Sequence, residues 1–373
     1  MKRLRYRLRL LALLFLTLFL LLCAYAVWSL NSYGGRWFSY SANPRLSAQK
    51  ANVTEGDILD RNGVLLATTV DGKRVFQDSA ALRSAVVHII GDRNGMIANS
   101  VETFHAAWLY GYSSSLQDAI YRLTHPGEER RGNNVTLTVD SALCAAIPEY
   151  YSSHEQTRSK NGAAVVINYL TGETIALVSL PSFDPDDSDS ESLSALDSPY
   201  LNRALQANLY PPGSVFKIVC TAAALENLPG IEERTFTCTG ALPVSDSFTV
   251  KDFNGVSHGN ISLREAFTRS CNSVYASLAL EMGDSALRSA AERFGFNRNF
   301  LFRDLVVENS SYPLENRTSE SVAASGYGQS ALAVTPMHLC LISAAIANNG
   351  IMREPRLLLS AVTSGGQQTL SFS

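Results

Sequence analysis

The feature that most constrains this chain is an apolar run near its N-terminus. The 21 residues of Leu10–Leu30 (LLALLFLTLFLLLCAYAVWSL) carry no charge. At about 1.5 Å per helical residue, a helix of this length can cross a hydrocarbon core of about 30 Å. Tyr25 and Trp28 lie near its far end, where aromatic rings favour the membrane interface. The run therefore predicts a transmembrane anchor over residues 10–30.

The charge beside this run predicts its orientation. Residues 1–9 contain five basic residues and no acidic one. Basic flanks stay in the cytoplasm, so we expect a short cytoplasmic tail, with everything after Leu30 outside the cell membrane. A cleaved signal peptide is the alternative, because Ala24-Tyr25-Ala26 resembles a cleavage site. The length of the apolar run favours an uncleaved single-pass anchor.

Composition narrows the class of the remaining chain. Hydrophobic residues make up 46% and charged residues 17% of the sequence, which is typical of a folded protein. The net charge is −3, so the part after the basic tail is more acidic still, and a nucleic-acid partner is not expected. The six cysteines are scattered, without the short Cys and His spacings of a metal site. We predict no metal site and no cofactor.

Two extracytoplasmic parts can be separated along the chain. Residues 31–159 contain the segment GDILDRNGVLLATTV, which predicts two strands around Asn62-Gly63, and we expect a mostly-β domain there. Residues 160–373 open with Gly162–Leu180, in which two β-branched runs flank Thr171-Gly172 and predict an antiparallel hairpin. An acidic, serine-rich stretch follows and predicts a solvated loop. Helical patterns then dominate, over Ser214–Glu226, Ser262–Met282, Ser285–Phe294 and Thr335–Asn348. The predicted fold class is α+β.

One Ser-x-x-Lys pair has the surroundings of a catalytic site. Ser214 and Lys217 follow Pro211-Pro212-Gly213, which predicts a helix start at Ser214. The helix is apolar on every face except at Lys217, so it is expected to be buried. Burial disfavours a charged amine, and a neutral lysine beside a serine hydroxyl is a base beside a nucleophile. A serine N-cap with a surface-reaching lysine is the structural alternative.

Two other patterns compete for the role of nucleophile. Ser47 and Lys50 form a second Ser-x-x-Lys pair, but no apolar helix follows them, and we interpret them as part of a polar linker. GVSHG, around Ser257, matches the Gly-x-Ser-x-Gly elbow of serine hydrolases. No hydrophobic strand precedes it, and its triad would need His338 from within a helical run, so we interpret it as a turn.

A second polar element lies fifty-six residues after Ser214. Ser270 and Asn272 are separated by one residue and bounded by apolar helical segments. A Ser-x-Asn element facing a Ser-x-x-Lys pair can relay a proton to a leaving amine and orient a substrate through its amide. A polar cap at a helix end is the alternative.

Several motifs in one order give the chain a family resemblance. It resembles a class B penicillin-binding protein, a peptidoglycan D,D-transpeptidase. The segments that carry the resemblance are GDILDRNGVLLA, HIIGDRNG, NVTLTVDSAL, GAAVVINYLTGETIALVSLPSFDPDD, NRALQANLYPPGSVFKIV, HGNISLREAFTRSCNSVYASLA and SGYGQSALAVTPMHLCLISAAIANNG. The resemblance implies that residues 31–159 form a non-catalytic pedestal and residues 160–373 a β-lactamase-like transpeptidase domain.

The same resemblance implies the chemistry. Ser214 becomes the acylated nucleophile, Lys217 its base, Ser270 the proton relay and Asn272 the substrate-orienting amide. The implied substrates are D-Ala–D-Ala stem peptides, and β-lactams would acylate the same serine. Other cell-wall synthesis proteins, such as a SEDS-type glycosyltransferase, are implied as partners.

The sequence departs from the family pattern at the third motif. None of its six lysines is followed by Thr-Gly or Ser-Gly, and the chain ends at SAVTSGGQQTLSFS. We expect a transpeptidase domain that lacks its C-terminal strands, truncated before the Lys-Thr-Gly motif, with an exposed edge on the Gly162–Leu180 hairpin. An inactive penicillin-binding sensor or scaffold is the alternative function. A Ser-x-x-Lys β-lactamase is disfavoured because a pedestal would have no purpose there.

Overall fold

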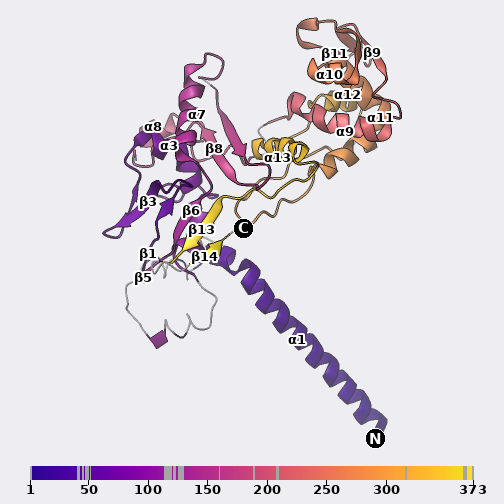
Figure 1. Cartoon of the computed structure of the whole chain (residues 1–373). Coiled ribbons are helices and arrows are strands. Elements are labelled where there is room, and N and C mark those ends of the chain that lie inside the picture. The colour runs from indigo at the N-terminus through magenta and orange to yellow at the C-terminus, as the bar shows by residue number, and fades with distance from the viewer. Residues whose placement is uncertain are drawn as a thin grey trace. The chain divides into compact units, whose positions relative to one another are not determined.

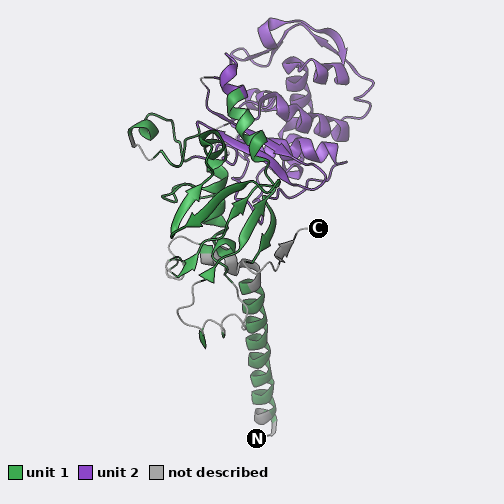
Figure 2. Ribbon diagram, turned by 60° about the vertical axis from the view of Figure 1, so that its left-hand side comes forward, with its two compact units in different colours: residues 1–149, 182–200, 357–373 green, residues 150–181, 201–356 purple. Residues whose placement is uncertain are grey.

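A computed structural model gives the fold of the chain (Figure 1). It describes residues 2–39, 43, 46, 50, 52–112, 120, 123–124, 130–158, 160–187, 190–206, 210–315, 317–363 and 368–371. The chain divides into two compact units (Figure 2). Unit 1 comprises residues 1–149, 182–200 and 357–373, and unit 2 comprises residues 150–181 and 201–356.

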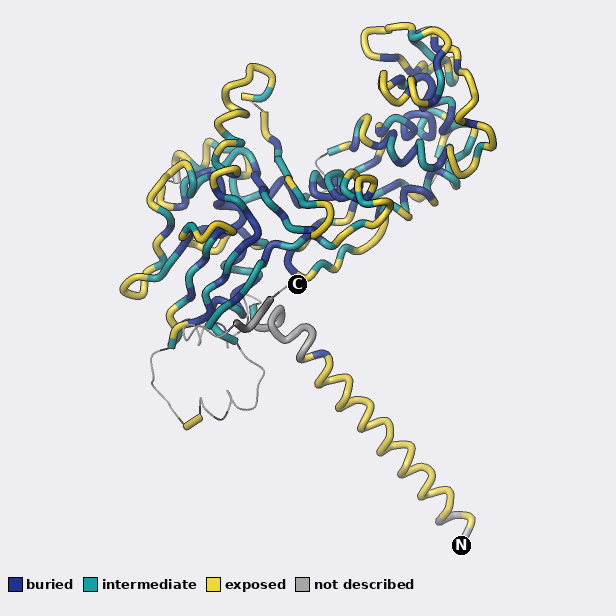
Figure 3. Tube along the Cα trace, in the orientation of Figure 1, coloured by how far each residue is buried: buried dark blue, intermediate teal, exposed yellow. Residues whose placement is uncertain are grey.

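The N-terminal apolar run forms one long helix, α1 (Lys2–Ser39). Its segment Tyr6–Leu30 is long and apolar enough to cross a membrane. The side chains of this segment are exposed almost throughout (Figure 3). An exposed apolar helix is stable in lipid but not in water, so α1 is compatible with the predicted membrane anchor. The helix continues beyond Leu30 to Ser39.

Unit 1 is built on a six-stranded sheet in the order β14-β13-β6-β2-β3-β4. Strands β2 and β6 pair in parallel and the other neighbours pair antiparallel. Two further strands, β1 and β5, form a separate parallel pair. The elements of this unit after α1 are β1 (Val53–Thr54), β2 (Ile58–Leu59), β3 (Leu65–Val70), β4 (Lys73–Phe76), α3 (Ala80–Ile90), α4 (Val101–Phe104), α5 (Ala106–Leu109), β5 (Arg130–Arg131), β6 (Asn134–Leu137), α7 (Ser141–Ser153, which ends in unit 2), α8 (Ser190–Ser194), β13 (Leu358–Val362) and β14 (Gln368–Ser371).

The turn of the first predicted hairpin is organised by a buried carboxylate. Asp60 is 1% exposed. Its Oδ1 accepts hydrogen bonds from the amides of Asn62 and Val64 at 2.8 and 2.9 Å. Its Oδ2 accepts from the amide and hydroxyl of Ser141 at 3.1 and 2.7 Å. Asp60 therefore closes the β2–β3 turn and also fastens it to the start of α7. The predicted strands around Asn62-Gly63 are confirmed.

The next hairpin, β3–β4, was not predicted from the sequence. Strands β3 and β4 are joined by Asp71-Gly72, and both residues have positive φ angles, of 50° and 72°. Two positive φ angles define the type I′ turn that suits the twist of a two-residue hairpin. The Asp-Gly pair was the signal that could have predicted it.

Unit 2 contains short strand pairs around a helical core. Its elements are β7 (Gly162–Ile167), β8 (Thr174–Leu180), η1 (Gly213–Phe216), α9 (Lys217–Asn227), β9 (Thr235–Cys238), β10 (Ala241–Pro243), β11 (Thr249–Lys251), η2 (Phe253–Gly255), β12 (Gly259–Ser262), α10 (Leu263–Thr268), α11 (Asn272–Arg293), α12 (Ser319–Gly326) and α13 (Pro336–Ala347). Strand β7 pairs with β8, β9 with β12, and β10 with β11, all antiparallel. The predicted hairpin Gly162–Leu180 is confirmed, and α13 packs against its strand β7.

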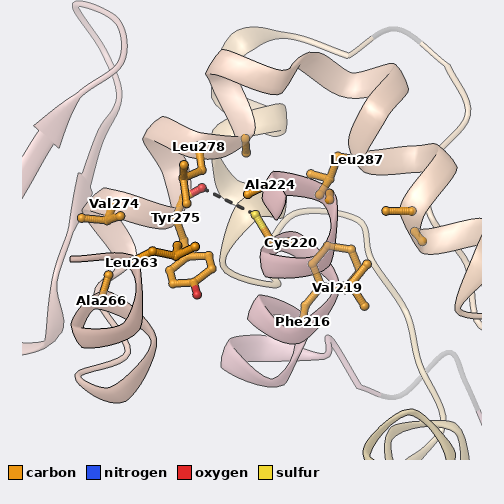
Figure 4. Close-up of a cluster of buried hydrophobic side chains, with 14 of the residues drawn as sticks. Phe216, Val219, Cys220, Ala224, Leu263, Ala266, Val274, Tyr275, Leu278 and Leu287 are labelled. Carbon is orange, nitrogen blue, oxygen red and sulfur yellow. Dashed lines mark hydrogen bonds between the residues drawn. The ribbon is translucent and has the colours of Figure 1, made fainter. Parts of the chain in front are cut away.

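The helices α9 and α11 form the centre of unit 2 (Figure 4). Their facing sides bury Val219, Cys220, Val274, Tyr275 and Leu278, among others, and Phe216 at the end of η1 joins this core. The Phe216 ring packs edge-on against Phe296 with ring centroids 5.5 Å apart. Burying large apolar and aromatic side chains on both helices stabilises the unit and fixes how the two helices meet. This core determines where the polar ends of α9 and α11 lie.

The predicted helix over Ser262–Met282 is wrong in one respect. The chain forms two helices there, because α10 ends at Thr268 and α11 begins at Asn272. The residues between them include Ser270, with a φ of 54°. A left-handed residue cannot continue a right-handed helix, so the chain turns sharply at the polar element. The other predicted helix starts, at Ser214 and after Thr335, are confirmed to within a turn.

Candidate active site

The start of α9 places a serine at the surface and a lysine in the interior. Ser214 lies in the 3₁₀ turn η1 and is exposed, whereas Lys217 begins α9 and is 1% exposed. The three-residue spacing puts both side chains on one face. The Lys217 Nζ lies 3.3 Å from the Ser214 Oγ. The predicted pair is therefore in hydrogen-bonding contact.

Lys217 also reaches the polar element between α10 and α11. Its Nζ lies 2.7 Å from the carbonyl oxygen and 2.9 Å from the Oγ of Ser270. It lies 2.8 Å from the Oδ1 of Asn272. All four predicted site residues, Ser214, Lys217, Ser270 and Asn272, thus meet at one amine.

The chemistry of these partners suits a neutral amine. The Ser270 carbonyl and the Asn272 Oδ1 can only accept hydrogen bonds, so each takes one N–H of Lys217. A neutral amine has two N–H groups and one lone pair. With both N–H groups used, the lone pair is left for a hydroxyl proton of Ser214 or Ser270. The arrangement can therefore accept a proton from the Ser214 hydroxyl.

Burial acts in the same direction. The pKa of Lys217 is lowered from its ordinary value of 10.5 to about 8, chiefly because burial disfavours the charged form. The nearby Cys271, Asp252 and Cys220 oppose this shift. A base whose pKa lies near neutrality is available for proton transfer under physiological conditions.

The second element owes its geometry to a strained turn. Ser270 lies in the left-handed region, which costs a residue other than glycine on the order of 1–3 kcal/mol. The amides of Ser270 and Cys271 donate to the carbonyls of Phe267 and Ala266 at 3.0 and 2.9 Å and hold the turn. The turn directs both the carbonyl and the hydroxyl of Ser270 toward Lys217.

Two groups orient Asn272. Its Nδ2 donates to the carbonyl of Lys251 at 3.1 Å, so its Oδ1 faces Lys217. Its backbone amide donates to the Oδ1 of Asp252 at 2.5 Å. Asp252 also accepts from the amide and hydroxyl of Ser273 and is 3% exposed. It satisfies the first amides of α11, a role that the sequence analysis missed because Asp252 has no motif of its own.

A glycine behind the nucleophile is required by close backbone contact. The amide of Gly213 donates to the carbonyl of Gly328 at 2.9 Å. A Cβ on Gly328 would lie 1.8 Å from the carbonyl oxygen of Gly213, and its φ of 78° also favours glycine. The residue before Ser214 is therefore set against Gly328. This role of Gly328 was not predicted from the sequence, although it lies in a Gly-Tyr-Gly string.

The competing nucleophiles are not organised in this way. The Ser257 hydroxyl donates to the carbonyl of Cys238 at 2.8 Å, in the turn before β12. The two ring nitrogens of His338 contact the Ser310 Oγ and the Phe294 carbonyl, both at 2.7 Å, inside the core. Burial lowers the pKa of His338 to about 4, so it is a neutral core residue. Ser47 lies outside the described residues.

Comparison with known proteins identifies the family. Residues 162–371, more than half of the chain, match the family model described as the penicillin binding protein transpeptidase domain. The chain therefore belongs to the penicillin-binding protein transpeptidase family. This confirms the predicted family and its mixed α+β fold.

The relatives include named transpeptidases. Peptidoglycan D,D-transpeptidase PbpA of Mycolicibacterium smegmatis is 33% identical over 251 residues, covering 63% of this chain and 50% of the relative. Peptidoglycan D,D-transpeptidase MrdA of Acinetobacter baumannii is 31% identical over 281 residues, covering 66% of this chain and 39% of the relative. The chain thus spans about half or less of these relatives.

Solved structures show the same fold. Penicillin-binding protein A of Mycobacterium tuberculosis, as a ceftriaxone acyl-enzyme complex, matches with a TM-score of 0.74 and 27% identity. The match covers 88% of this chain and 76% of that chain. The D,D-transpeptidase domain of a peptidoglycan glycosyltransferase from Eggerthella lenta matches with a TM-score of 0.63 and 26% identity, covering 86% of this chain and 76% of that chain.

Proposed function

We propose that this protein is a peptidoglycan D,D-transpeptidase that forms an acyl-enzyme on Ser214. The observation that carries the proposal is the position of the Lys217 Nζ, 3.3 Å from the Ser214 Oγ and 2.9 Å from the Ser270 Oγ. A buried amine of lowered pKa between two hydroxyls can take a proton from one and return it through the other.

The first half-reaction acylates the serine. The Ser214 Oγ attacks the carbonyl of the D-Ala–D-Ala bond of a stem peptide, and its proton passes to the Lys217 Nζ. The amide N–H groups at the start of α9 and the helix dipole favour the negative charge that forms on the carbonyl oxygen. As the C–N bond breaks, the proton passes through the Ser270 hydroxyl to the leaving amine, which departs as D-alanine.

The second half-reaction forms the cross-link. An amine of a neighbouring stem peptide attacks the ester and gives up a proton, through the Ser270 hydroxyl, to the neutral Lys217. The C–O bond to Ser214 then breaks as the new amide forms, and the Ser214 Oγ takes that proton from Lys217. Asn272 keeps its Oδ1 on Lys217 and its Nδ2 on the Lys251 carbonyl, which places the amide beside the reacting centre. A β-lactam would acylate Ser214 by the same first step.

Helix α1 supports a membrane setting for this protein. Its apolar segment Tyr6–Leu30 and the basic residues before it support a single-pass anchor in the cell membrane. The active site would then face the outside of the cell, where peptidoglycan and other cell-wall synthesis proteins, such as a SEDS-type glycosyltransferase, are found.

Labelling with a fluorescent penicillin tests the acylation step. The full chain in detergent should become covalently labelled, and mass spectrometry should place the adduct on the peptide that contains Ser214. Ser214→Ala should abolish the label. Ser257→Ala is the matched control and should retain it, because Ser257 lies outside the site. A folded protein that takes no label, or that still labels after Ser214→Ala, would refute the proposal.

An inactive penicillin-binding sensor or scaffold is the second candidate. The two functions separate in an assay with a stem pentapeptide donor and a D-amino acid acceptor. A transpeptidase releases D-alanine and forms the exchanged peptide. A sensor takes the penicillin label but does neither.

A further inference from the structure

A buried tyrosine of α11 lies against the amine of the active site. Tyr275 is 0% exposed and follows Asn272 by three residues, so it lies on the helix face that carries the Asn272 amide. The Lys217 Nζ lies over the Tyr275 ring, 5.5 Å from the ring centroid. The amine that contacts Ser214 therefore also contacts the face of an aromatic ring.

The hydroxyl of Tyr275 is held by hydrogen bonds that lead back to Lys217. The Thr221 hydroxyl donates to the Lys217 carbonyl at 2.7 Å, one turn earlier in α9. Because this uses the only proton of Thr221, the Tyr275 hydroxyl, 2.6 Å away, donates to the Thr221 Oγ1. The ring is thus held to Lys217 at its hydroxyl end, through Thr221, as well as at its face.

The backbone of Tyr275 is held from two sides. Its carbonyl accepts a hydrogen bond from the Cys220 Sγ of α9 at 4.0 Å (Figure 4). A Cβ on Gly326 of α12 would lie 2.3 Å from the same carbonyl oxygen, so α12 approaches α11 closely here. The position of the ring beside Lys217 is therefore set by the packing of three helices.

The surroundings of Lys217 offer an ammonium no contacting carboxylate among the described residues. The hydrogen-bond acceptors of its Nζ are neutral oxygens of Ser214, Ser270 and Asn272. The nearby thiols of Cys220 and Cys271 are neutral too, because burial raises the pKa of each to about 12. Asp252 is the acidic side chain whose charge acts on Lys217, and its oxygens accept hydrogen bonds from the first residues of α11. A positive charge on Lys217 is therefore balanced mainly by neutral dipoles and by the Tyr275 ring.

We propose that Tyr275 is a positioning residue of the reaction, whose ring stabilises the Lys217 ammonium that forms when the Ser214 hydroxyl gives up its proton. The face of an aromatic ring attracts a cation within about 6 Å of its centroid, most strongly when both are removed from water. The attraction is weak for a neutral amine, so it grows as the proton is transferred. An interaction that strengthens along the reaction lowers its barrier. This role rests on the proposed function of Ser214 and Lys217.

A weaker ring should change the pH profile of acylation in a way that a packing defect does not. It lowers the pKa of Lys217 further, so the inflection moves to lower pH. The plateau rate also falls, because a weaker base accepts the serine proton less readily. Below the inflection the larger neutral fraction offsets the weaker base, so the rates differ less there. A packing defect would instead slow acylation at every pH.

The experiment compares aromatic rings of nearly equal size at position 275. The full chain in detergent is prepared with tyrosine, phenylalanine, 4-fluorophenylalanine or 3,4,5-trifluorophenylalanine there, and labelling by a fluorescent penicillin is followed from pH 6 to pH 10. Fluorine withdraws electrons and weakens the attraction of the ring face for a cation. The phenylalanine form should keep the inflection of the natural chain. The trifluorinated form should inflect about one pH unit lower and reach a plateau about tenfold lower.

The monofluorinated form should lie between these two, and it keeps the test decisive if the trifluorinated chain does not fold. The same replacements at Tyr312 are the matched control. Tyr312 is 1% exposed and its hydroxyl donates to the Asp284 Oδ1 at 2.9 Å, so the inflection should stay in place.

The outcomes separate this role from the proposed function. Equal inflections across the fluorinated series, or a loss of rate that is uniform with pH, would overturn the role of Tyr275 and leave acylation of Ser214 intact. Labelling that persists in Ser214→Ala would overturn the proposed function, and the role of Tyr275 with it.

Discussion

Acylation of Ser214 should become faster as the pH rises through the pKa of Lys217. Burial lowers that pKa from 10.5 to about 8. This lowering of the pKa by about 2.5 corresponds to ~3 kcal/mol in favour of the neutral amine. At pH 7 it raises the neutral fraction of Lys217 by roughly 300-fold, to about a tenth of the molecules.

The assay is the second-order rate constant for labelling by a fluorescent penicillin between pH 6 and pH 10. The rate should rise about tenfold per pH unit well below the inflection and level off above it, because only the neutral amine accepts the serine proton. Lys217→Arg should lose nearly all labelling at every pH, since guanidinium stays protonated. Far-ultraviolet circular dichroism at each pH, with return to pH 7.5, controls for unfolding.

The lowered pKa of Lys217 also predicts how the free energy of unfolding changes with pH. The folded pKa lies below the unfolded one, so between about pH 8 and pH 10.5 the unfolded chain binds more protons at Lys217. The contribution of Lys217 to the free energy of unfolding therefore rises with pH in this window. A flat rate profile, an inflection near the ordinary lysine value, or an active Lys217→Arg variant would refute the role of a neutral Lys217.

Three further predictions concern the supports of the site and of unit 1. Gly328→Ala should reduce penicillin labelling at least tenfold, because its Cβ would lie 1.8 Å from the Gly213 carbonyl oxygen; unchanged labelling kinetics would contradict this. Ser270→Ala and Ser270→Gly should both slow acylation. In denaturant titrations the glycine variant should have a free energy of unfolding about 1 kcal/mol higher than the alanine variant, because glycine relieves the left-handed strain. Equal stabilities of the two variants would argue against strain. Asp60→Asn should lower the free energy of unfolding by roughly 1–3 kcal/mol in denaturant titrations, because its amide would face the Ser141 donors. Burial alone would raise the pKa of Asp60, but hydrogen bonds from Ser141, Val64 and Asn62 lower it, so this stabilisation should be lost as the pH falls below the ordinary value of about 3.9 and should be absent from the variant.

Local patterns were enough to predict several elements of the fold. The apolar run predicted α1, the β-branched runs around Thr171-Gly172 predicted the β7–β8 hairpin, and Pro-Pro-Gly predicted the helix start at Ser214. Each depends on forces between residues close in the chain, such as backbone sterics, turn conformation and hydrophobic periodicity. The spacing of Ser214 and Lys217 on one helix face is of the same kind.

Tertiary structure decided what these elements do together. The helical pattern around Ser270 gave no sign of the left-handed break, which brings the Ser270 carbonyl within 2.7 Å of Lys217. Nor could spacing show that strand register gathers Cys238 and His258 beside Asp252 and Cys271. The same holds for β13, which pairs with β6 more than two hundred residues away. The sequence by itself determined α1, the β7–β8 hairpin and the helix start at Ser214, because those choices are local. The approach of Lys217 to Ser270 and Asn272 depends on the packing of α9 against α11, which only the folded chain decides.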